Sequence, residues 1–483
     1  MEPVSLFGAG TVGKSAVVTS QRRLNCYIEV RPDGDKNKHV VYGRPGLASY
    51  LTLSPTPNGP IRGAYATDSY LHAVAGTTYY KYDRTLTANT TDTGTITTDS
   101  NPVGMVHGGT ELLVVDGAQG HSVTNADSTT ASVLTAIASA NFPDAARTCT
   151  FLGGRFVVED PASPGRFRWS GSYDATAWAS LDFATAEQNP DTLRAVDSDH
   201  GHLVLFGTAA IEWWQLSGAI DSPYAPVIPA TQQWGLAATY SRAHLDNTIY
   251  FLAQNRQGQV QVARFNGYNV ERVSDSDIEN IINGFSTVED AVASSSLIDG
   301  HPLYTLTFPT AGRSFEFDAS TLIWSEKQTG ADNIPARFVG QHSVAFNGFP
   351  LVSHKTSPII YKVSPTTYTD GGEIIKRLIQ SRHIRKDGNR FTIDEIYLDM
   401  ETGVGLPTGQ GSDPLIVMQV SKDGGRSWGV ERWADIGAMG EHKTRAIWRR
   451  LGSSEDFVFR FYVTDPVKFV ITGGYAKVRA RNQ

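Results

Sequence analysis

The most recognisable chemical motif of the chain lies near its beginning. The residues from Gly8 to Ser15 read GAGTVGKS and match the phosphate-loop pattern G-x-x-x-x-G-K-[ST]. In that pattern backbone amides bind nucleotide phosphates, Lys14 would contact the γ-phosphate and Ser15 would contact Mg²⁺. A phosphate loop must connect a strand to a long helix in an alternating α/β domain. The residues that follow favour extended structure, so we expect no working nucleotide hydrolase, and the role of this segment stays open.

A second motif, near the C-terminus, predicts a turn. Ser421, Asp423, Gly425 and Trp428 belong to the stretch SKDGGRSW, which resembles the Asp-box S-x-D-x-G-x-[ST]-W. The Ser421 and Asp423 side chains can cap a hairpin turn, Gly425 supplies the backbone freedom that the turn needs, and Trp428 packs beneath. The motif recurs in sialidase-like propellers, but here it occurs once and outside the repeats described below. We therefore expect a structural hairpin rather than a marker of glycosidase activity.

No other pattern predicts catalysis. The 12 histidines are scattered without the spacing of a metal site, and there is no G-x-S-x-G elbow. Cys26 and Cys149 cannot make a disulfide framework or a thiolate zinc site on their own. Trp213, Trp214 and Trp234 could stack on bases or sugars, but packing in the core is the better interpretation. The sequence predicts no enzyme, no cofactor and no metal.

Charge is distributed unevenly along the chain. Residues 376–483 contain 18 Lys and Arg against 13 Asp and Glu, a net charge of +5, whereas residues 1–375 contain 24 against 36, a net charge of −12. A dedicated binder of duplex DNA would usually show a dense basic stripe, and none is present. An acidic body with a mildly basic tail favours docking to other proteins. The candidate docking cluster consists of Lys443, Arg445, Arg449 and Arg450.

The elements that must position these residues are short strands in a repeating array. Apolar runs separated by Gly, Asn and Asp turns recur every 40 to 55 residues or so, the period of a β-propeller blade. The runs centre near Ala73, Val114, Val157, Val204, Tyr250, Thr305 and Val352. Radial repetition of this kind protects the edges of a long all-β chain. One helix is predicted, from capping residues at 274–277 followed by isoleucines at 278, 281 and 282.

The repeats divide the chain into three predicted parts. Residues 1–47 form a lead-in segment, residues 48–370 a β-propeller-like domain and residues 371–483 a C-terminal β domain. The alternation in FVFRFYV, residues 457–463, is typical of a sandwich strand. The predicted fold class is therefore all-β, with an array of about seven sheet repeats and a β-sandwich-like domain. Neither a membrane span nor a signal peptide is recognisable, so we expect a protein made in a reducing cytoplasm.

Several stretches, found in one order along most of the chain, are shared with a known family. They are residues 22–29 and 42–47, residues 166–170, 178, 181–187 and 189–191, residues 206–218 and 234–236, and residues 448–452, 459–461 and 465–467. In succession they resemble the tail hub or nozzle proteins of short-tailed bacteriophages, also called packaged-DNA stabilisation proteins of the P22 type.

The resemblance implies a structural protein of the virion tail, made in the host cytoplasm and without catalysis. It implies a hexameric ring below the portal and its adaptor, a channel for outgoing DNA, and tail needle, spike or fibre proteins below or beside the ring. Each basic contact adds affinity for phosphates, so an acidic array would let DNA slide through the lumen without tight binding. The basic tail domain would then bind an acidic neighbour.

Two other classes of function stay open at this point. A glycan-binding or glycan-hydrolysing propeller, such as a receptor-degrading enzyme, would need a pocket with paired acids at the propeller mouth and turnover on host glycans. A nucleotide hydrolase would need magnesium-dependent ATP binding that Lys14→Ala abolishes. The sequence does not give the ring stoichiometry, the neighbouring tail proteins, the residues that line the lumen, or the host.

Overall fold

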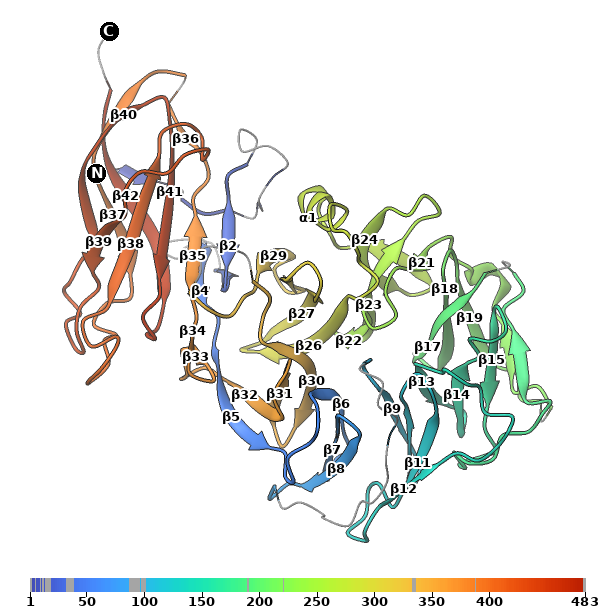
Figure 1. Ribbon diagram of the computed structural model, residues 1–483. Helices are drawn as coiled ribbons and strands as arrows, with labels where there is room; N and C mark the ends of the chain where they lie inside the picture. The colour runs from blue at the N-terminus through green and yellow to red at the C-terminus, as the bar shows by residue number, and fades with distance from the viewer. Residues whose placement is uncertain are drawn as a thin grey trace.

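The structure is a computed structural model that describes residues 2–4, 6–8, 10, 13, 19–31, 39–86, 96, 101–188, 191–219, 221–331, 336–386 and 388–480. Almost all regular elements among these residues are strands, and they form a ring of small sheets with a second, two-sheet domain beside it (Figure 1). The helical elements described are α1 (Ser276–Ile282) and the short 3-10 turn η1 (Ile228–Ala230).

Seven antiparallel sheets make up the ring, and we number them as blades in chain order. Blades 1 to 3 contain β6 (Ile61–Ala66), β7 (Tyr70–Ala75) and β8 (Thr78–Asp83); β9 (Gly104–Gly108), β10 (Glu111–Val115), β11 (Gly120–Thr124) and β12 (Val133–Ala136); and β13 (Cys149–Leu152), β14 (Arg155–Glu159), β15 (Arg166–Trp169) and β16 (Phe183–Thr185).

Blades 4 to 6 follow the same pattern. They contain β17 (Leu193–Asp199), β18 (His202–Gly207), β19 (Ile211–Leu216) and β20 (Tyr224–Pro226); β21 (Gly235–Leu236), β22 (Ala243–Leu245), β23 (Thr248–Gln254), β24 (Val260–Asn266) and β25 (Asn269–Arg272); and β26 (Val292–Ile298), β27 (His301–Phe308), β28 (Arg313–Asp318) and β29 (Ile323–Glu326).

Blade 7 closes the ring with strands from both ends of the array. It contains β30 (Gly340–Phe346), β31 (Phe349–His354), β32 (Ile359–Ser364) and, from the N-terminal side, β5 (Gly46–Thr52), with β33 (Thr369–Asp370) and β34 (Glu373–Ile374) beyond it. Strands β6, β9, β13 and β17 contact one another in that order, β22 contacts β26, and β26 contacts β30, which returns to β6. The predicted propeller-like array of about seven sheets is therefore confirmed.

Separate apolar cores fill the spaces between neighbouring blades. Between blades 4 and 5, Phe206 and Trp213 pack against Phe251 and Phe265. Trp214 faces the other way, into the core shared with blade 3, so both tryptophans are core residues as the sequence predicts. The second strand of a blade has a core on each face, which is why β7 is buried along its whole length.

The helix α1 lies between blades 5 and 6 in the chain. The Asp275 side chain caps it by accepting hydrogen bonds from the amides of Asp277 and Ile278 at 3.1 and 2.8 Å. Ile278 and Ile282 are buried in the core that blades 5 and 6 share. The capping residues and the apolar spacing thus produce the helix that the sequence predicts.

The second domain is a sandwich of two sheets. The β37 sheet has the order β3 (Cys26–Val30), β4 (His39–Gly43), β42 (Val470–Ala480), β37 (Phe391–Met400) and β40 (Ile447–Ser454), with β1 (Glu2–Val4) also paired to β42. The β41 sheet has the order β2 (Arg22–Leu24), β35 (Arg377–Gln380), β41 (Asp456–Val463), β38 (Leu415–Ser421) and β39 (Arg432–Asp435), with β36 (Ile384–Arg385) on β41. Phe457, Phe459 and Phe461 of β41 enter the core between the sheets, and the predicted β-sandwich-like domain is confirmed.

Strands β1 to β4 all come from residues 1–47. β1 and β4 pair with β42, and β3 pairs with β4. β2 bridges the two domains: Leu24 pairs with Leu378 of β35 on one side and, in parallel, with Glu326 of β29 on the other. One ten-stranded sheet therefore runs from blade 6 into the sandwich. The predicted boundaries at residues 47 and 370 stay predictions, and the structure adds that the N-terminal strands hydrogen-bond with the sandwich.

A buried ion pair joins the place where the chain enters the propeller to the place where it leaves. The Arg44 guanidinium donates to both carboxylate oxygens of Asp370 at 2.8 and 2.5 Å, and the side chains are 5% and 0% exposed. Arg44 also donates to the Asn25 side chain and to the Gln328 carbonyl, and Thr329 donates to Asp370. Both charges of the Arg44–Asp370 pair thus have several partners, as burial requires.

Gly43 and Gly46, on either side of Arg44 and Pro45, lie so close to other parts of the chain that a side chain would not fit. A Cβ on Gly46 would lie 2.4 Å from the Thr369 carbonyl oxygen, and a Cβ on Gly43 would lie 2.5 Å from the Arg377 side chain. The amide of Gly46 donates to the Thr367 carbonyl at 2.7 Å. Glycine is therefore needed on both sides of Arg44 and Pro45, where the chain passes between the two domains.

A second contact between the domains is aromatic and involves His301 of blade 6. Its Nδ1 lies 2.7 Å from an Asp318 carboxylate oxygen, and the Tyr27 ring of β3 packs on the imidazole with centroids 4.9 Å apart. The hydrogen bond to Asp318 raises the pKa of His301. Burial alone would raise the pKa of Asp318, but its hydrogen bond with His301 holds that pKa below the ordinary value.

We predict that Asp370→Ala lowers the free energy of unfolding by about 3 to 5 kcal/mol, because it leaves the buried Arg44 charge without a partner. The measurement is equilibrium urea unfolding followed by tryptophan fluorescence. Glu29→Ala is the matched control, since it breaks the exposed Arg31–Glu29 pair and should cost less than about 1 kcal/mol. Equal losses of unfolding free energy in the two variants would contradict a special role of the Arg44–Asp370 pair.

We also predict that His301 makes stability depend on pH. The folded pKa of His301 is raised above its unfolded value of about 6.5, so its contribution is fully present below that pH and is lost as the pH rises through the folded pKa. The stability difference between the wild type and His301→Gln should therefore shrink as the pH rises from about 6.5 into the alkaline range. Thermal unfolding across this range measures it, and a difference that grows with pH would contradict the assignment.

Candidate docking sites

The candidate docking cluster lies at one edge of the sandwich. Arg449 and Arg450 are on β40, the edge strand of the β37 sheet, and Lys443 and Arg445 are in the loop before it. All four side chains are exposed. Arg445 lies 5.9 Å from the ring centroid of Tyr397, and Arg449 donates to Glu395 at 2.8 Å. Arg445 and Arg449 thus both contact side chains of β37, Tyr397 and Glu395. No contact of Lys443 or Arg450 with these two arginines is seen among the described residues.

Two basic residues that sequence reasoning missed lie on the same face. Glu395 is in register with Arg449 on one side and with Lys477 of β42 on the other. Arg479 of β42 pairs with Asp394 at 2.6 Å. We call Arg445, Arg449, Lys477 and Arg479 the basic face. The alternation in YAKVRA, residues 475–480, was the signal that could have placed Lys477 and Arg479 on one side of a strand.

The basic face keeps most of its charge available to a partner. Arg449 and Arg479 are 66% and 69% exposed although each has a carboxylate partner. Exposed ion pairs of this kind are weak, so exchange of partners is cheap. Stacked rings of Tyr397 and Tyr475, with centroids 5.0 Å apart, support the strands beneath. The face can therefore bind an acidic surface without large rearrangement.

The Asp-box residues form the turn between β38 and β39. Asp423 accepts hydrogen bonds from the Ser421 hydroxyl at 2.6 Å and from the amides of Arg426 and Ser427 at 3.0 and 2.9 Å. The amide of Gly425 donates to the Ser421 hydroxyl at 2.8 Å. These hydrogen bonds, that from Ser421 first, hold the pKa of Asp423 well below its ordinary value.

Trp428 lies beyond the turn rather than in it. Its ring is half-buried, and the Arg460 guanidinium of β41 packs on it at 3.8 Å from the centroid. Burial, followed by the nearby charge of Arg22, lowers the pKa of Arg460 to about 10. The tryptophan thus fastens the end of the hairpin to the face of the β41 sheet through a cation–π contact.

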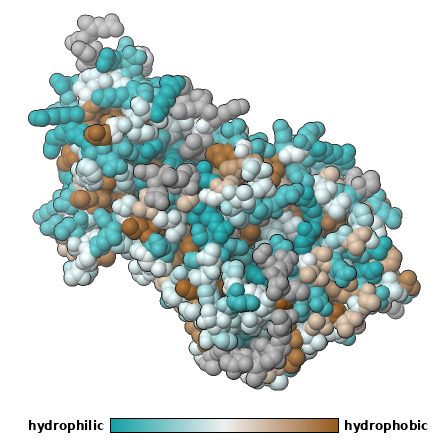
Figure 2. Space-filling model, in the orientation of Figure 1, coloured by the Kyte–Doolittle hydropathy of each residue, from teal (hydrophilic) through white to brown (hydrophobic). Residues whose placement is uncertain are grey.

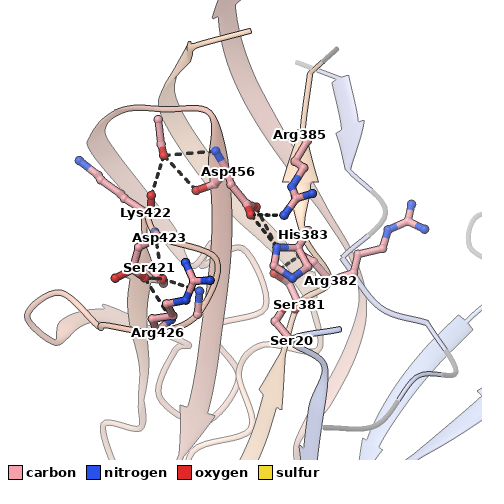
Figure 3. A network of polar contacts seen from close by, with 12 residues as sticks. Ser20, Ser381, Arg382, His383, Arg385, Ser421, Lys422, Asp423, Arg426 and Asp456 are labelled. Carbon is pink, nitrogen blue, oxygen red and sulfur yellow. Dashed lines mark hydrogen bonds and ion pairs between the residues drawn. The ribbon is translucent and has the colours of Figure 1, made fainter. Parts of the chain in front are cut away.

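A second polar network lies next to the Asp-box turn, as Figure 3 shows. The Asp456 carboxylate binds His383 Nδ1 at 2.8 Å and Arg385 at 2.7 Å. The Ser20 hydroxyl donates to the Ser381 carbonyl at 3.0 Å, which ties the segment before β2 to the same corner. This arrangement stabilises the corner of the sandwich.

A cavity of about 370 Å³ lies at the ring axis, lined by the first strands of the blades. Within it the Asp197 carboxylate binds Arg242 and, at 2.9 Å, His244. Burial would raise the pKa of Asp197, but the Arg242 and His244 charges outweigh it and hold the pKa below the ordinary value. A cavity of this volume is too small for duplex DNA, so the axis of a single propeller cannot be a DNA channel.

Other predicted sites can be placed only in part. Of residues 8–15, Lys14 and Ser15 lie outside the described residues, and the Gly8 carbonyl accepts a hydrogen bond from Arg23 at 2.7 Å. Among the described residues, no group of three His, Cys, Asp or Glu side chains is placed to hold a metal ion. None of the helices described has the length and apolar character that a membrane crossing needs. Figure 2 shows hydrophobic residues only in small, separate patches on the visible face.

The fold defines a class: an all-β protein that pairs a propeller with a β-sandwich. Comparison with known families agrees. The family profile described as bacteriophage P22 Gp10, beta-propeller, matches residues 25–368, and the one described as bacteriophage P22 Gp10, beta-sandwich, matches residues 376–479. The chain belongs to the bacteriophage P22 Gp10 family of phage structural proteins. The alternative of a glycan-binding or glycan-hydrolysing propeller as the function of this chain is not favoured.

Comparisons with individual proteins add little. No curated protein matches the chain. The N-terminal domain of Nup159 is 10% identical and covers 69% of this chain and 97% of its own, with a TM-score of 0.38. The computationally designed Ika8 protein is 10% identical and covers 71% and 99%, with a TM-score of 0.38. YCF48 bound to D1 peptide is 12% identical and covers 66% and 99%, with a TM-score of 0.36. At these scores the likeness carries no argument.

We predict that Asp423→Ala loosens the Asp-box turn without unfolding the sandwich. Hydrogen bonds to a charged acceptor contribute roughly 1.5 to 3 kcal/mol, so the amides of Arg426 and Ser427 should exchange with solvent about ten times faster or more. Hydrogen exchange read by NMR or mass spectrometry measures this. Asp413→Ala, which removes an exposed carboxylate elsewhere in the same domain, is the control and should leave these amides unchanged.

Proposed function

We propose that this chain is the tail hub, or nozzle, of a short-tailed phage. In this proposal it forms a ring, taken as a hexamer, below the portal and its adaptor, retains packaged DNA until infection, and forms part of the ejection channel. Tail needle, spike or fibre proteins bind below or beside the ring. The family match over both domains is the observation that carries the proposal.

The geometry of the propeller supports a channel that lies between copies rather than within one. The axial cavity of a single ring of blades has a volume of only about 370 Å³. Identical chains that contact one another head to tail close into a ring when the rotation allows it, and such a ring has a central lumen. DNA would therefore pass along the axis of the assembly, past the outer surfaces of several propellers.

The charge distribution supports weak contact with DNA and firm contact with protein. Residues 1–375 carry a net charge of −12, which disfavours retention of phosphates on the propeller. The basic face of the sandwich carries four exposed cations next to two carboxylates, Asp394 and Glu395. We propose that this face, extended at its edge by Lys443 and Arg450, binds an acidic surface of the neighbouring copy or of the adaptor.

In this proposal the two domains have different roles. The propeller, proposed as residues 48–370, forms the rigid wall, and the C-terminal β domain, proposed as residues 371–483, makes the contacts. Strand β2 and the Arg44–Asp370 pair join the two, so force on one domain is transmitted to the other. The proposed site of action is the virion tail, after synthesis in the host cytoplasm.

The mass of the purified chain, alone and mixed with portal–adaptor complexes, tests the ring. We expect light scattering to give six copies in the complex and negative-stain images to show a ring on the portal axis. A chain that stays monomeric and does not bind the portal–adaptor complex would overturn the proposal.

We predict that the double charge reversal Arg445→Glu with Arg449→Glu blocks assembly onto its partner. Each reversal removes one attraction and adds one repulsion, and like charges facing each other in an interface cost several kcal/mol. Infectivity and tail assembly of phage that carry the variant measure the effect, with a loss of at least about a hundredfold expected.

The control is Arg426→Glu with Arg382→Glu. Arg426 is exposed at the Asp-box turn and Arg382 lies beside Ser381 on the β41 side of the sandwich, away from the basic face. This control changes the net charge by the same amount. Assembly that is impaired equally in both double variants would show an effect of net charge alone and would contradict docking through the basic face.

A further inference from the structure

A cleft of about 400 Å³ opens between blades 4 and 5, far from the sandwich and separate from the axial cavity. Three tight turns enclose it: His200–Gly201 joins β17 to β18, Asp246–Asn247 joins β22 to β23, and Gly267–Tyr268 joins β24 to β25. Backbone φ angles at His200, Asp246 and Asn247 are positive, as two-residue hairpin turns demand. The cleft walls are thus fixed by the blades behind them.

One wall of the cleft is a rigid aromatic platform. The Tyr268 ring is held by two edge-on contacts, with centroids 5.2 Å from Trp213 and 5.5 Å from His202. Trp213 is buried, whereas Tyr268 is 40% exposed. A flat ring that is fixed from behind and open in front binds the apolar face of a ligand at a small entropic cost.

The hydrogen bonds around that platform determine which of its atoms donate and which accept. His202 Nδ1 lies 3.1 Å from the His200 carbonyl and therefore carries the proton, so Nε2 accepts from the Tyr268 hydroxyl at 3.0 Å. His200 Nδ1 donates in the same way to Asp199 at 2.8 Å, and its Nε2 accepts from the Asn247 amide at 2.8 Å. The Tyr268 oxygen and the remaining amide atoms of Asn247 are left to accept from and donate to a ligand.

The charges of the cleft select against anions and against apolar ligands. Asp199 and Asp246 both line it, and the guanidinium of Arg264 is already bound to Glu271 at 2.9 Å and to the Tyr250 hydroxyl at 3.2 Å. A phosphate or carboxylate would therefore meet two carboxylates, and the one arginine of the lining, Arg264, already has its charge balanced by Glu271. An apolar ligand would leave the amide and carboxylate groups of the rim without partners.

We propose that this cleft binds a saccharide: a neutral ring with one apolar face and a rim of hydroxyls. The apolar face of the sugar stacks on Tyr268, and its hydroxyls bind the Asn247 amide, the Tyr268 oxygen and the two carboxylates. The volume of about 400 Å³ suits one or two sugar rings and lies within the range of ordinary ligand pockets. This proposal concerns binding alone and does not depend on the ring proposed above.

Saturation-transfer NMR on the purified full chain, with the methyl glycosides of glucose, galactose and N-acetylglucosamine as probes, tests the proposal. We expect transfer to at least one glycoside. Tyr268→Ala should abolish it, and Asn247→Asp, which keeps a residue that tolerates the turn, should reduce it severalfold. Tyr173→Ala, which removes a tyrosine 59% exposed on blade 3, is the matched control and should leave the transfer unchanged.

Two results would overturn the proposal: no transfer to any of the three glycosides, or transfer that Tyr268→Ala leaves at the wild-type level. The melting temperature of each variant separates loss of binding from loss of folding. If Tyr268→Ala is unstable, the saturation transfer from the Asn247→Asp variant tests the proposal instead. Either negative result would leave the ring and its assembly onto the portal unaffected, because neither uses this cleft.

Discussion

The buried pair of Arg44 and Asp370 is the interaction on which the rest of the structure depends. A propeller built from one chain is closed only if its first strand returns to its last blade, and here β5 does so by pairing with β32. Arg44 stands directly before β5, and Asp370 lies in β33, which also pairs with β5. Two charges taken out of water are tolerated only with full hydrogen bonding, and Asn25, Gln328 and Thr329 complete it. The ion pair thus supports both the closure of the ring and the junction with the sandwich.

From that point the two domains act as a single body with different surfaces. The parallel pairing of β2 with β29 continues a blade of the propeller into the sandwich, and the core between the sandwich sheets holds the N-terminal strands in place. The propeller is acidic, whereas the sandwich presents the basic face on the outer side of the β37 sheet. A rigid body with opposite charges at separate places is suited to head-to-tail contact between copies.

Much of this architecture could be predicted from the sequence, and the reason is packing. The seven apolar runs correspond to the middle strands of the blades, such as β7 and β18, which have apolar cores on both faces. The pairing of the strands in residues 1–47 could not be predicted, because β2 has three residues and its partners lie more than 300 positions away. Arg445 and Arg449 were recognisable as neighbours, but Lys477 and Arg479 join them only through strand register. The cleft between blades 4 and 5 depends on three turns that meet only after the blades pack.

Electron cryomicroscopy of the intact virion tail tests the central claim most directly. The account predicts a ring of copies directly below the adaptor, each with a seven-bladed propeller and a sandwich fused through β2, and with Arg445, Arg449, Lys477 and Arg479 against an acidic surface. The DNA path should run along the ring axis between propellers. A tail in which this chain forms no ring, or in which the basic face lies open to solvent in every copy, would contradict it.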